Sequence, residues 1–175
     1  LGMHRIEERA VVRDGQIVLT AADGGWPTVM TTTAGGESGI AWSPDGSSLA
    51  FVSAGSIWTV PSAGGAPARL TDGRAGTGDP RNAADRQPAW SPDGQWILFE
   101  SGRRGNTDLL VVSRDGLTSQ FVVSTDADEG AAAWSPDGTR IAYIERSAAH
   151  FSGRLLIADV DRAGARVRGA PRERL

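Results

Sequence analysis

The hexapeptide Ala41-Trp42-Ser43-Pro44-Asp45-Gly46 occurs three times in this chain of 175 residues. It returns unchanged at residues 89–94 and 133–138, which places successive tryptophans 48 and 44 positions apart. Identity at every position in three copies indicates an internal repeat of about 45 residues rather than coincidence. The remaining segments are therefore interpreted as parts of repeated units.

Each hexapeptide leads into a segment in which every second residue is apolar, a period typical of a β-strand. Within the hexapeptide, proline fixes φ for the second position of a turn, aspartate tolerates the next position, and glycine accepts the positive φ that closes a hairpin. The motif therefore predicts a strand, a tight turn and a second strand. The apolar pairs that follow it are Leu49 and Phe51, Ile97 and Phe99, and Ile141 and Tyr143.

Two further strands are predicted in these units. A third strand at 57–60, 109–112 and 155–158 is apolar on both faces, which is typical of a strand between two layers. A fourth strand is expected at 68–71 and 121–124. The N-terminal segment repeats only the second half of the unit, because residues 15–18 and 30–31 align at a shift of 40 with residues 55–58 and 70–71.

Units of four antiparallel strands that recur every 40 to 50 residues are typical of β-propeller blades. We therefore expect an all-β fold, a β-propeller of four-stranded antiparallel blades with about three and a half to four blades in a partial ring. An open arc exposes two blade faces, so the length suggests a fragment, or a half-ring that pairs with another chain. The expected divisions are an N-terminal arm with one more strand (1–14), a half blade (15–31), a blade (32–71), a blade with a long loop at its start (72–124), a blade (125–168) and a disordered basic tail (169–175).

The pattern P-x-W-S-P-D-G, followed by x-I-A-F and L-T, resembles the TolB-type propeller repeat, which is also found in the N-terminal propellers of prolyl oligopeptidase-like serine peptidases. The resemblance covers roughly residues 15–160, and the first proline of the pattern is present only as Pro88, with Ile40 and Ala132 in the other copies. It implies a propeller fold, and a periplasmic or exported location. A cytoplasmic location is the alternative, and the N-terminal residues of the sequence contain no apolar export segment.

Composition excludes several kinds of chemistry. The formal net charge is -3, there is no cysteine, and all 18 basic residues are arginine. Disulfides, thiolate metal sites and cysteine nucleophiles are therefore excluded, as are phosphate-binding and Schiff-base lysines. No apolar segment reaches the length that a membrane span needs, so we expect no membrane insertion.

The repeated side chains have structural interpretations. A tryptophan at the same place in every unit is expected to pack between blades rather than to contact a ligand. The repeated aspartates are expected to accept hydrogen bonds within turns rather than to bind metal.

No catalytic residue and no cofactor are predicted. The segment Gly36-Glu37-Ser38-Gly39-Ile40 lacks the last glycine of a nucleophile elbow, and it precedes a strand rather than a helix. His4 and His150 are too few for a three-histidine zinc site. The run at Asp126, Asp128 and Glu129 is a weak cation-binding candidate, since it lacks the full set of ligands and short acidic runs are usually solvated.

The binding residues are expected on the loops that vary between units. The resemblance implies that the loops from one blade to the next, and those between the second and third strands, lie on one face. Loops on a rigid scaffold concentrate binding residues, although tolerant surface loops are the equally weighted alternative. The candidates on these loops are Arg74, Arg81, Arg86, Arg103, Arg104, His150 and Phe151.

Two functions remain open. The first is a non-catalytic TolB-like module that binds a protein or peptide on its variable-loop face. A second copy of the chain is a further candidate partner, in a homodimer that completes the ring. The second is part of the gating propeller of a prolyl oligopeptidase-like peptidase whose hydrolase domain lies outside these residues. Despite the C-terminal arginines, the net charge does not favour a nucleic-acid partner.

Overall fold

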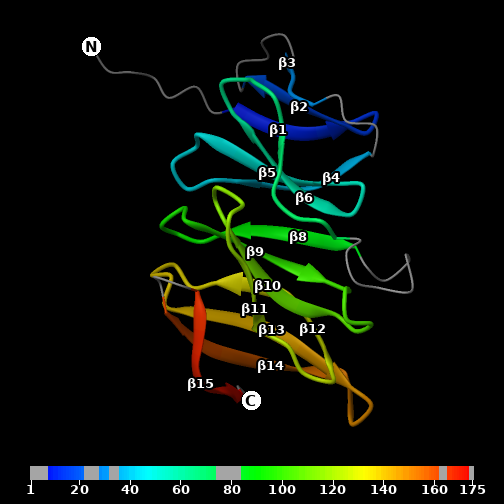
Figure 1. Ribbon diagram of the computed structural model, residues 1–175, viewed down its shortest axis with the longest axis vertical. Coiled ribbons are helices and arrows are strands. Elements are labelled where there is room, and N and C mark those ends of the chain that lie inside the picture. Colours follow the sequence, from blue (N-terminus) through cyan, green and yellow to red (C-terminus); the bar gives the residue numbers. More distant parts are fainter. Residues whose placement is uncertain (1–7, 22–27, 32–35, 74–83, 162–164, 174–175) are drawn as a thin grey trace.

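The computed structural model describes residues 8–21, 28–31, 36–73, 84–161 and 165–173, and within these ranges it is built from four antiparallel sheets (Figure 1). The sheets follow one another along the chain, and we call them the first to fourth blade. The first blade has three strands, β1 (Glu8–Arg13), β2 (Gln16–Ala21) and β3 (Thr28–Val29). The second has β4 (Glu37–Trp42), β5 (Ser48–Ser53), β6 (Ser56–Pro61) and β7 (Ala68–Arg69).

The third and fourth blades also have four strands each. The third contains β8 (Asp85–Trp90), β9 (Trp96–Ser101), β10 (Asp108–Ser113) and β11 (Ser119–Val123). The fourth contains β12 (Asp128–Trp134), β13 (Arg140–Ser147), β14 (His150–Asp161) and β15 (Arg166–Glu173). In every blade, strands that are adjacent in the chain are adjacent in the sheet.

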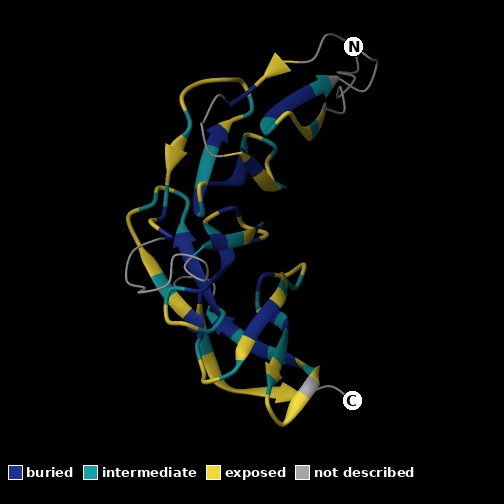
Figure 2. Ribbon diagram, turned by 90° about the vertical axis from the view of Figure 1, so that its right-hand side faces the viewer, coloured by how far each residue is buried: buried dark blue, intermediate teal, exposed yellow. Residues whose placement is uncertain are grey.

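The four blades stack in an unclosed crescent, with the first and the fourth blade at its two ends (Figures 1 and 2). The predicted all-β partial propeller is therefore confirmed. Within the described ranges, no helix has the length and apolar character that crossing a membrane would require.

The hexapeptide forms the predicted tight turn. The Ser43 N–H donates to the Ser48 carbonyl at 2.9 Å, and Gly46 has a φ of 70°. The Asp45 carboxylate accepts hydrogen bonds from the Ser43 hydroxyl at 2.6 Å and from the Ser47 N–H at 3.0 Å. The predicted turn role of the repeated aspartates is therefore confirmed. The same contacts recur at Asp93 and Asp137.

The repeated tryptophans connect each blade to the one before it. The Trp90 indole N–H donates to the Ala41 carbonyl of the second blade at 3.2 Å, and the Trp134 indole N–H donates to the Ala89 carbonyl of the third blade at 3.3 Å. Trp90 is 7% exposed and belongs to an apolar cluster with Val52 of the second blade. The predicted packing role is therefore confirmed.

Three apolar clusters fill the three spaces between consecutive blades. Because successive side chains of a strand point to opposite faces, one strand contributes to two clusters. Phe51 packs toward the first blade, whereas its neighbour Val52 packs toward the third. A middle blade is thus apolar on both faces because both faces are covered.

The solvent exposure of the third strand in a unit depends on how many faces of that blade are covered. In β10, the residues Leu109 to Val112 are all essentially inaccessible to solvent, as predicted for a strand between two layers. In β14, by contrast, Leu155 is 43% exposed while its neighbour Leu156 is buried. The difference arises because described residues pack against only one face of the fourth blade.

The expected disorder of the basic tail at 169–175 is corrected in part, because residues 169–173 continue β15, which pairs with β14. The arginines of β15 find carboxylates on the neighbouring strand: Arg168 lies 2.9 Å from Asp161, and Arg172 lies 3.2 Å from Asp159. Backbone pairing and these ion pairs place an exposed, charged segment in a sheet. Residues 174–175 lie outside the described residues.

Substitution of Trp90 by alanine should lower the free energy of unfolding by about 3–5 kcal/mol, because it removes a large side chain from the space between two blades. Trp90→Phe retains most of the packing and loses the indole hydrogen bond to Ala41, so its cost should be clearly smaller. Urea unfolding followed by circular dichroism measures both variants. A near-neutral Trp90→Ala variant would contradict the packing role.

Candidate functional site

Each of the first strands β4, β8 and β12 has a buried carboxylate at or next to its start: Glu37, Asp85 and Glu129. The backbone N–H of each residue donates to a carbonyl of the preceding blade, which belongs to Gly15 at 3.0 Å, Gly55 at 2.9 Å and Thr107 at 2.7 Å respectively. We call each carboxylate together with its contacts a blade junction. The repeated main-chain bond fixes where the carboxylate lies relative to the preceding blade.

A threonine from the preceding blade's last segment completes the junction. Thr71 accepts a hydrogen bond from the Ile57 N–H at 2.9 Å and donates to the Asp85 carboxylate at 2.6 Å. Thr125 likewise donates to the Glu129 carboxylate. At both junctions a threonine hydroxyl therefore links two blades, although only Thr71 belongs to an L-T pair and Thr125 follows Ser124.

In the third-blade junction an arginine neutralises the buried charge. Arg103 donates to both oxygens of Asp85, at 2.9 and 3.0 Å, and Asp85 is fully buried. The guanidinium also donates to the Ser101 hydroxyl at 2.9 Å. Removal of either partner would leave a buried charge without its counter-ion.

The fourth-blade junction holds a buried carboxylate without such an arginine. Glu129 is fully buried, and its Oε2 atom has no hydrogen-bond partner among the described residues. Burial, together with the negative charges of Asp108 and Glu145, raises the pKa of Glu129 to about 7 even though the Thr125 hydroxyl opposes the shift. Asp108 is itself fully buried, and neither of its carboxylate oxygens has a partner in the described part of the chain.

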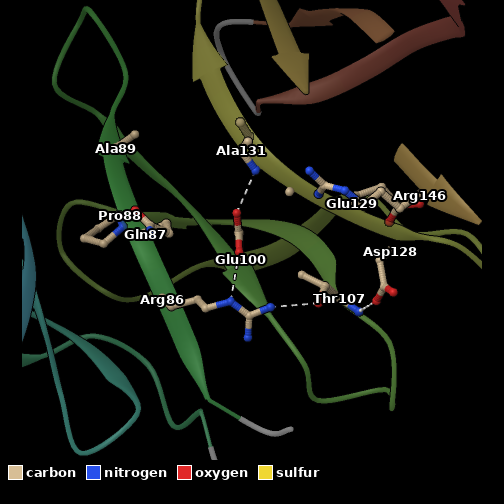
Figure 3. A pocket seen from close by; sticks show the side chains of 12 residues that line it. Arg86, Gln87, Pro88, Ala89, Glu100, Thr107, Asp128, Glu129, Ala131 and Arg146 are labelled. Carbon is tan, nitrogen blue, oxygen red and sulfur yellow. Dashed lines mark hydrogen bonds and ion pairs between the residues drawn. The ribbon is translucent and has the colours of Figure 1, made fainter. Parts of the chain in front are cut away.

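A cavity of about 470 Å³ opens in front of Glu129, between β8 and β12 (Figure 3). It lies at the end of the blades where β8 and β12 begin and where the loop from β9 to β10 turns. The charged or hydroxyl-bearing side chains that line it are Arg86, Glu100, Thr107, Asp128, Glu129 and Arg146.

Glu100 holds one wall of the cavity in place. Its carboxylate accepts hydrogen bonds from Arg86 Nε at 2.9 Å and from the Ala131 N–H at 2.7 Å, and Arg86 also donates to the Thr107 hydroxyl at 2.8 Å (Figure 3). A Cβ on Gly130 would lie 2.9 Å from Glu100 Oε1, so a larger residue at this position would force the Glu100 carboxylate to shift. This wall therefore consists of side chains that are already paired.

The two strands that flank the cavity each contain a bulge. Gln87 in β8 and Ala131 in β12 have φ values of 54° and 50°, in the left-handed region that non-glycine residues rarely adopt. Both lie where the pairing with the next strand shifts register. The same bulge occurs in β4, where Gly39 has a φ of 58°, so it belongs to the repeated unit.

Of the predicted loop residues, the structure places only Arg86 in the cavity lining among those it describes. Arg103 forms an ion pair with Asp85. The Arg104 guanidinium stacks on the Phe121 ring, with its central carbon 4.6 Å from the ring centroid. His150 is exposed where β14 begins, and it does not line the cavity. Phe151 lies next to it in β14 but its side chain is outside the description, and Arg74 and Arg81 lie outside the described residues.

The weak cation candidates are separated by the fold. Asp128 and Glu129 line the cavity, whereas Asp126 is exposed and does not. Asp128 accepts a hydrogen bond from the Thr107 N–H at 2.8 Å. Among the described residues, no three metal-binding side chains come together.

Sequence reasoning did not identify Glu100 or Asp108. A signal for Asp108 was present, because it opens β10 where Ser56 opens β6 and Gln16 opens β2. The corresponding residue is neutral and polar in the first two blades and is Arg154 in the fourth, so a carboxylate at this position is particular to the third blade.

Comparison with known proteins places the repeat in a family. The model of the TolB beta propeller domain matches residues 12–169. An uncharacterized protein of Agrobacterium fabrum is 27% identical over 153 residues, which cover 85% of this chain and 49% of that protein. The chain thus spans about half the length of this curated relative.

Solved structures give the same result for the fold. A protein of Agrobacterium tumefaciens described as a TolB candidate is 25% identical with a TM-score of 0.69, over 95% of this chain and 59% of that one. A puromycin-hydrolyzing peptidase of Mycobacterium tuberculosis superposes with a TM-score of 0.67 at 15% identity, over 97% of this chain and 31% of the peptidase. The second likeness concerns the fold alone.

Two adjacent arginines test the third-blade junction. Arg103→Met should lower the free energy of unfolding by about 2–4 kcal/mol, because it leaves Asp85 buried without its counter-ion. Arg104→Met is the matched control, and its cost should stay below about 1 kcal/mol because its ring contact is exposed. Urea unfolding compares the two variants. Equal losses would refute the special role of Arg103, and the double variant Arg103→Met with Asp85→Asn should recover part of the loss.

The fourth-blade junction predicts a pH dependence. Because the pKa of Glu129 is raised from 4.5 to about 7, the folded chain holds a proton there that the unfolded chain releases. The contribution of Glu129 to stability is therefore full below about pH 4.5 and falls as pH rises to about 7. Glu129→Gln should flatten this decline in urea unfolding measured at several pH values. An unchanged slope in the variant would show that another group titrates.

Proposed function

Because the chain belongs to the TolB β-propeller family, we propose that it is a non-catalytic module that binds a segment of another protein. The binding site is the cavity between β8 and β12, at the end of the blades where the variable loops lie. The observation that carries the proposal is this cavity of about 470 Å³, which has the size of ordinary ligand sites.

The chemistry of the lining supports binding. The described residues that line the cavity include no serine, cysteine, histidine or lysine, so they do not assemble the nucleophile and histidine base of a serine or cysteine hydrolase. They do include charged groups that are fixed by neighbours, as the contacts of Glu100 with Arg86 and Ala131 illustrate. A fixed polar lining binds with little loss of conformational entropy.

The architecture around the cavity also supports this function. β8 and β12 are each attached to the preceding blade by a main-chain hydrogen bond at their first residues, so the two walls keep their spacing. Binding residues on a rigid scaffold can be varied through the loops without loss of the fold.

A second candidate is the gating propeller of a prolyl oligopeptidase-like peptidase, since the Mycobacterium tuberculosis peptidase contains the fold on which 97% of this chain superposes. Reading the coding sequence downstream of Leu175 separates the candidates. A Gly-x-Ser-x-Gly motif followed by aspartate and histidine would favour the peptidase.

The proposal is tested by selecting peptides on the full chain from a random phage-displayed library. Arg146→Trp should weaken the selected peptides by about tenfold or more, because Arg146 lines the cavity and the larger indole obstructs it. Arg140→Trp is the matched control on the same strand, since Arg140 is exposed and lies outside the lining. Fluorescence anisotropy gives the dissociation constants. Failure to select any peptide, or equal binding by Arg146→Trp, would count against the proposal.

A further inference from the structure

The third- and fourth-blade junctions are built alike but differ in charge. In both, a threonine hydroxyl of the preceding blade donates to the buried carboxylate, and the backbone N–H of the acidic residue donates to a carbonyl of that blade. Arg103 supplies the counter-ion of Asp85 from a position two residues beyond Ser101, the register partner of Asp85. The register partner of Glu129 is Glu145, and two residues beyond it stands Ser147. The fourth-blade junction therefore lacks the arginine that its counterpart has.

The arginines near Glu129 do not replace the missing counter-ion. Arg154 pairs with Glu145 at 2.6 Å, and Arg86 is held by Glu100 and Thr107. Arg146 stands opposite Asp128 in the β12–β13 register, and among the described residues it forms no ion pair with Glu129. Arg154 and Arg86 are thus paired with other carboxylates, whereas Arg146 lines the cavity and forms no bond to Glu129 in the described part of the chain.

What the fourth-blade junction has instead of an arginine is the cavity. Glu129 lines it while fully buried, with Oε2 left without a partner (Figure 3). The buried charge of Asp108 adds negative potential at the same place. A buried carboxylate without a counter-ion costs free energy, and a cation placed against it offsets part of that cost.

We propose that this cavity receives the guanidinium group of an arginine of the bound protein segment, with Glu129 as its ion-pair partner. The proposal rests on the proposed function and adds the chemistry of the recognised side chain. The internal pair of Arg103 and Asp85 is the pattern that the bound arginine reproduces, in which one guanidinium contacts both oxygens of a buried carboxylate. Arginine suits this role because its planar donors match carboxylate geometry.

The test uses the full chain labelled with ¹⁵N and two blocked tripeptides, Gly-Arg-Gly and Gly-citrulline-Gly, whose side chains differ in charge and little in shape. The arginine tripeptide should shift the amide signals of Glu129, Gly130 and Ala131 saturably. The citrulline tripeptide should bind about tenfold more weakly or worse, because it cannot form the charge-assisted bond. Equal binding of the two tripeptides overturns the proposal.

Variants assign the effect to the named carboxylate. Glu129→Gln should weaken the arginine tripeptide about tenfold and remove its advantage over citrulline, whereas Asp126→Asn, an exposed carboxylate outside the lining, should change nothing. Asp108→Asn gives a second reading if Glu129→Gln fails to fold, and it should weaken the arginine tripeptide as well. Undiminished binding by the folded variants refutes the proposal, as does a response of the same amides to calcium chloride but not to the arginine tripeptide.

The two proposals fail separately. If selected peptides bind at the cavity but show no dependence on arginine or on Glu129, the proposed function stands and this inference is wrong. If Arg146→Trp weakens the binding of no selected peptide, the proposed function is wrong, whatever the tripeptides show.

Discussion

Face-to-face packing between neighbouring blades is the constraint on which the rest of this structure depends. A middle blade is apolar on both faces, so it is stable only between two others, and the alternation of Phe51 and Val52 toward opposite neighbours shows how one strand serves two interfaces. The indole N–H of each later repeated tryptophan fastens the same interface through a carbonyl of the preceding blade. Where described residues cover only one face, as in the fourth blade, the same strand pattern leaves Leu155 exposed.

The junction carboxylates extend this constraint to the end of the blades where the cavity lies. Each first strand is attached to the preceding blade by a main-chain hydrogen bond, so its carboxylate is buried by the architecture itself. Burial of a carboxylate is tolerated where an arginine neutralises it, as Arg103 does for Asp85. At Glu129 the same architecture buries the charge beside an open cavity, and a structural position thereby becomes a candidate binding site.

The repeat was sufficient to predict the blades, because a turn motif followed by period-two apolar residues restricts both the strand positions and their faces. The tight turns, the packing of the tryptophans and the double burial of β10 followed from local patterns. The order of β15 did not, because its arginines are paired with carboxylates of β14 that sequence proximity does not reveal. The roles of Glu100, which lines the cavity, and of Asp108, whose charge raises the pKa of Glu129, depend on contacts between blades, so no local pattern distinguished them from the loop arginines. Of those arginines, Arg103 and Arg104 have internal partners.

The central claim is that Glu129 is buried at the cavity without a counter-ion. Titration of its side-chain carboxyl by ¹³C nuclear magnetic resonance tests this most directly, in the free chain and with the arginine tripeptide present. We predict a midpoint near pH 7 in the free chain, and a lower midpoint with the tripeptide, because a neighbouring cation favours the ionised form. A midpoint near the ordinary value of 4.5 in the free chain would contradict the account.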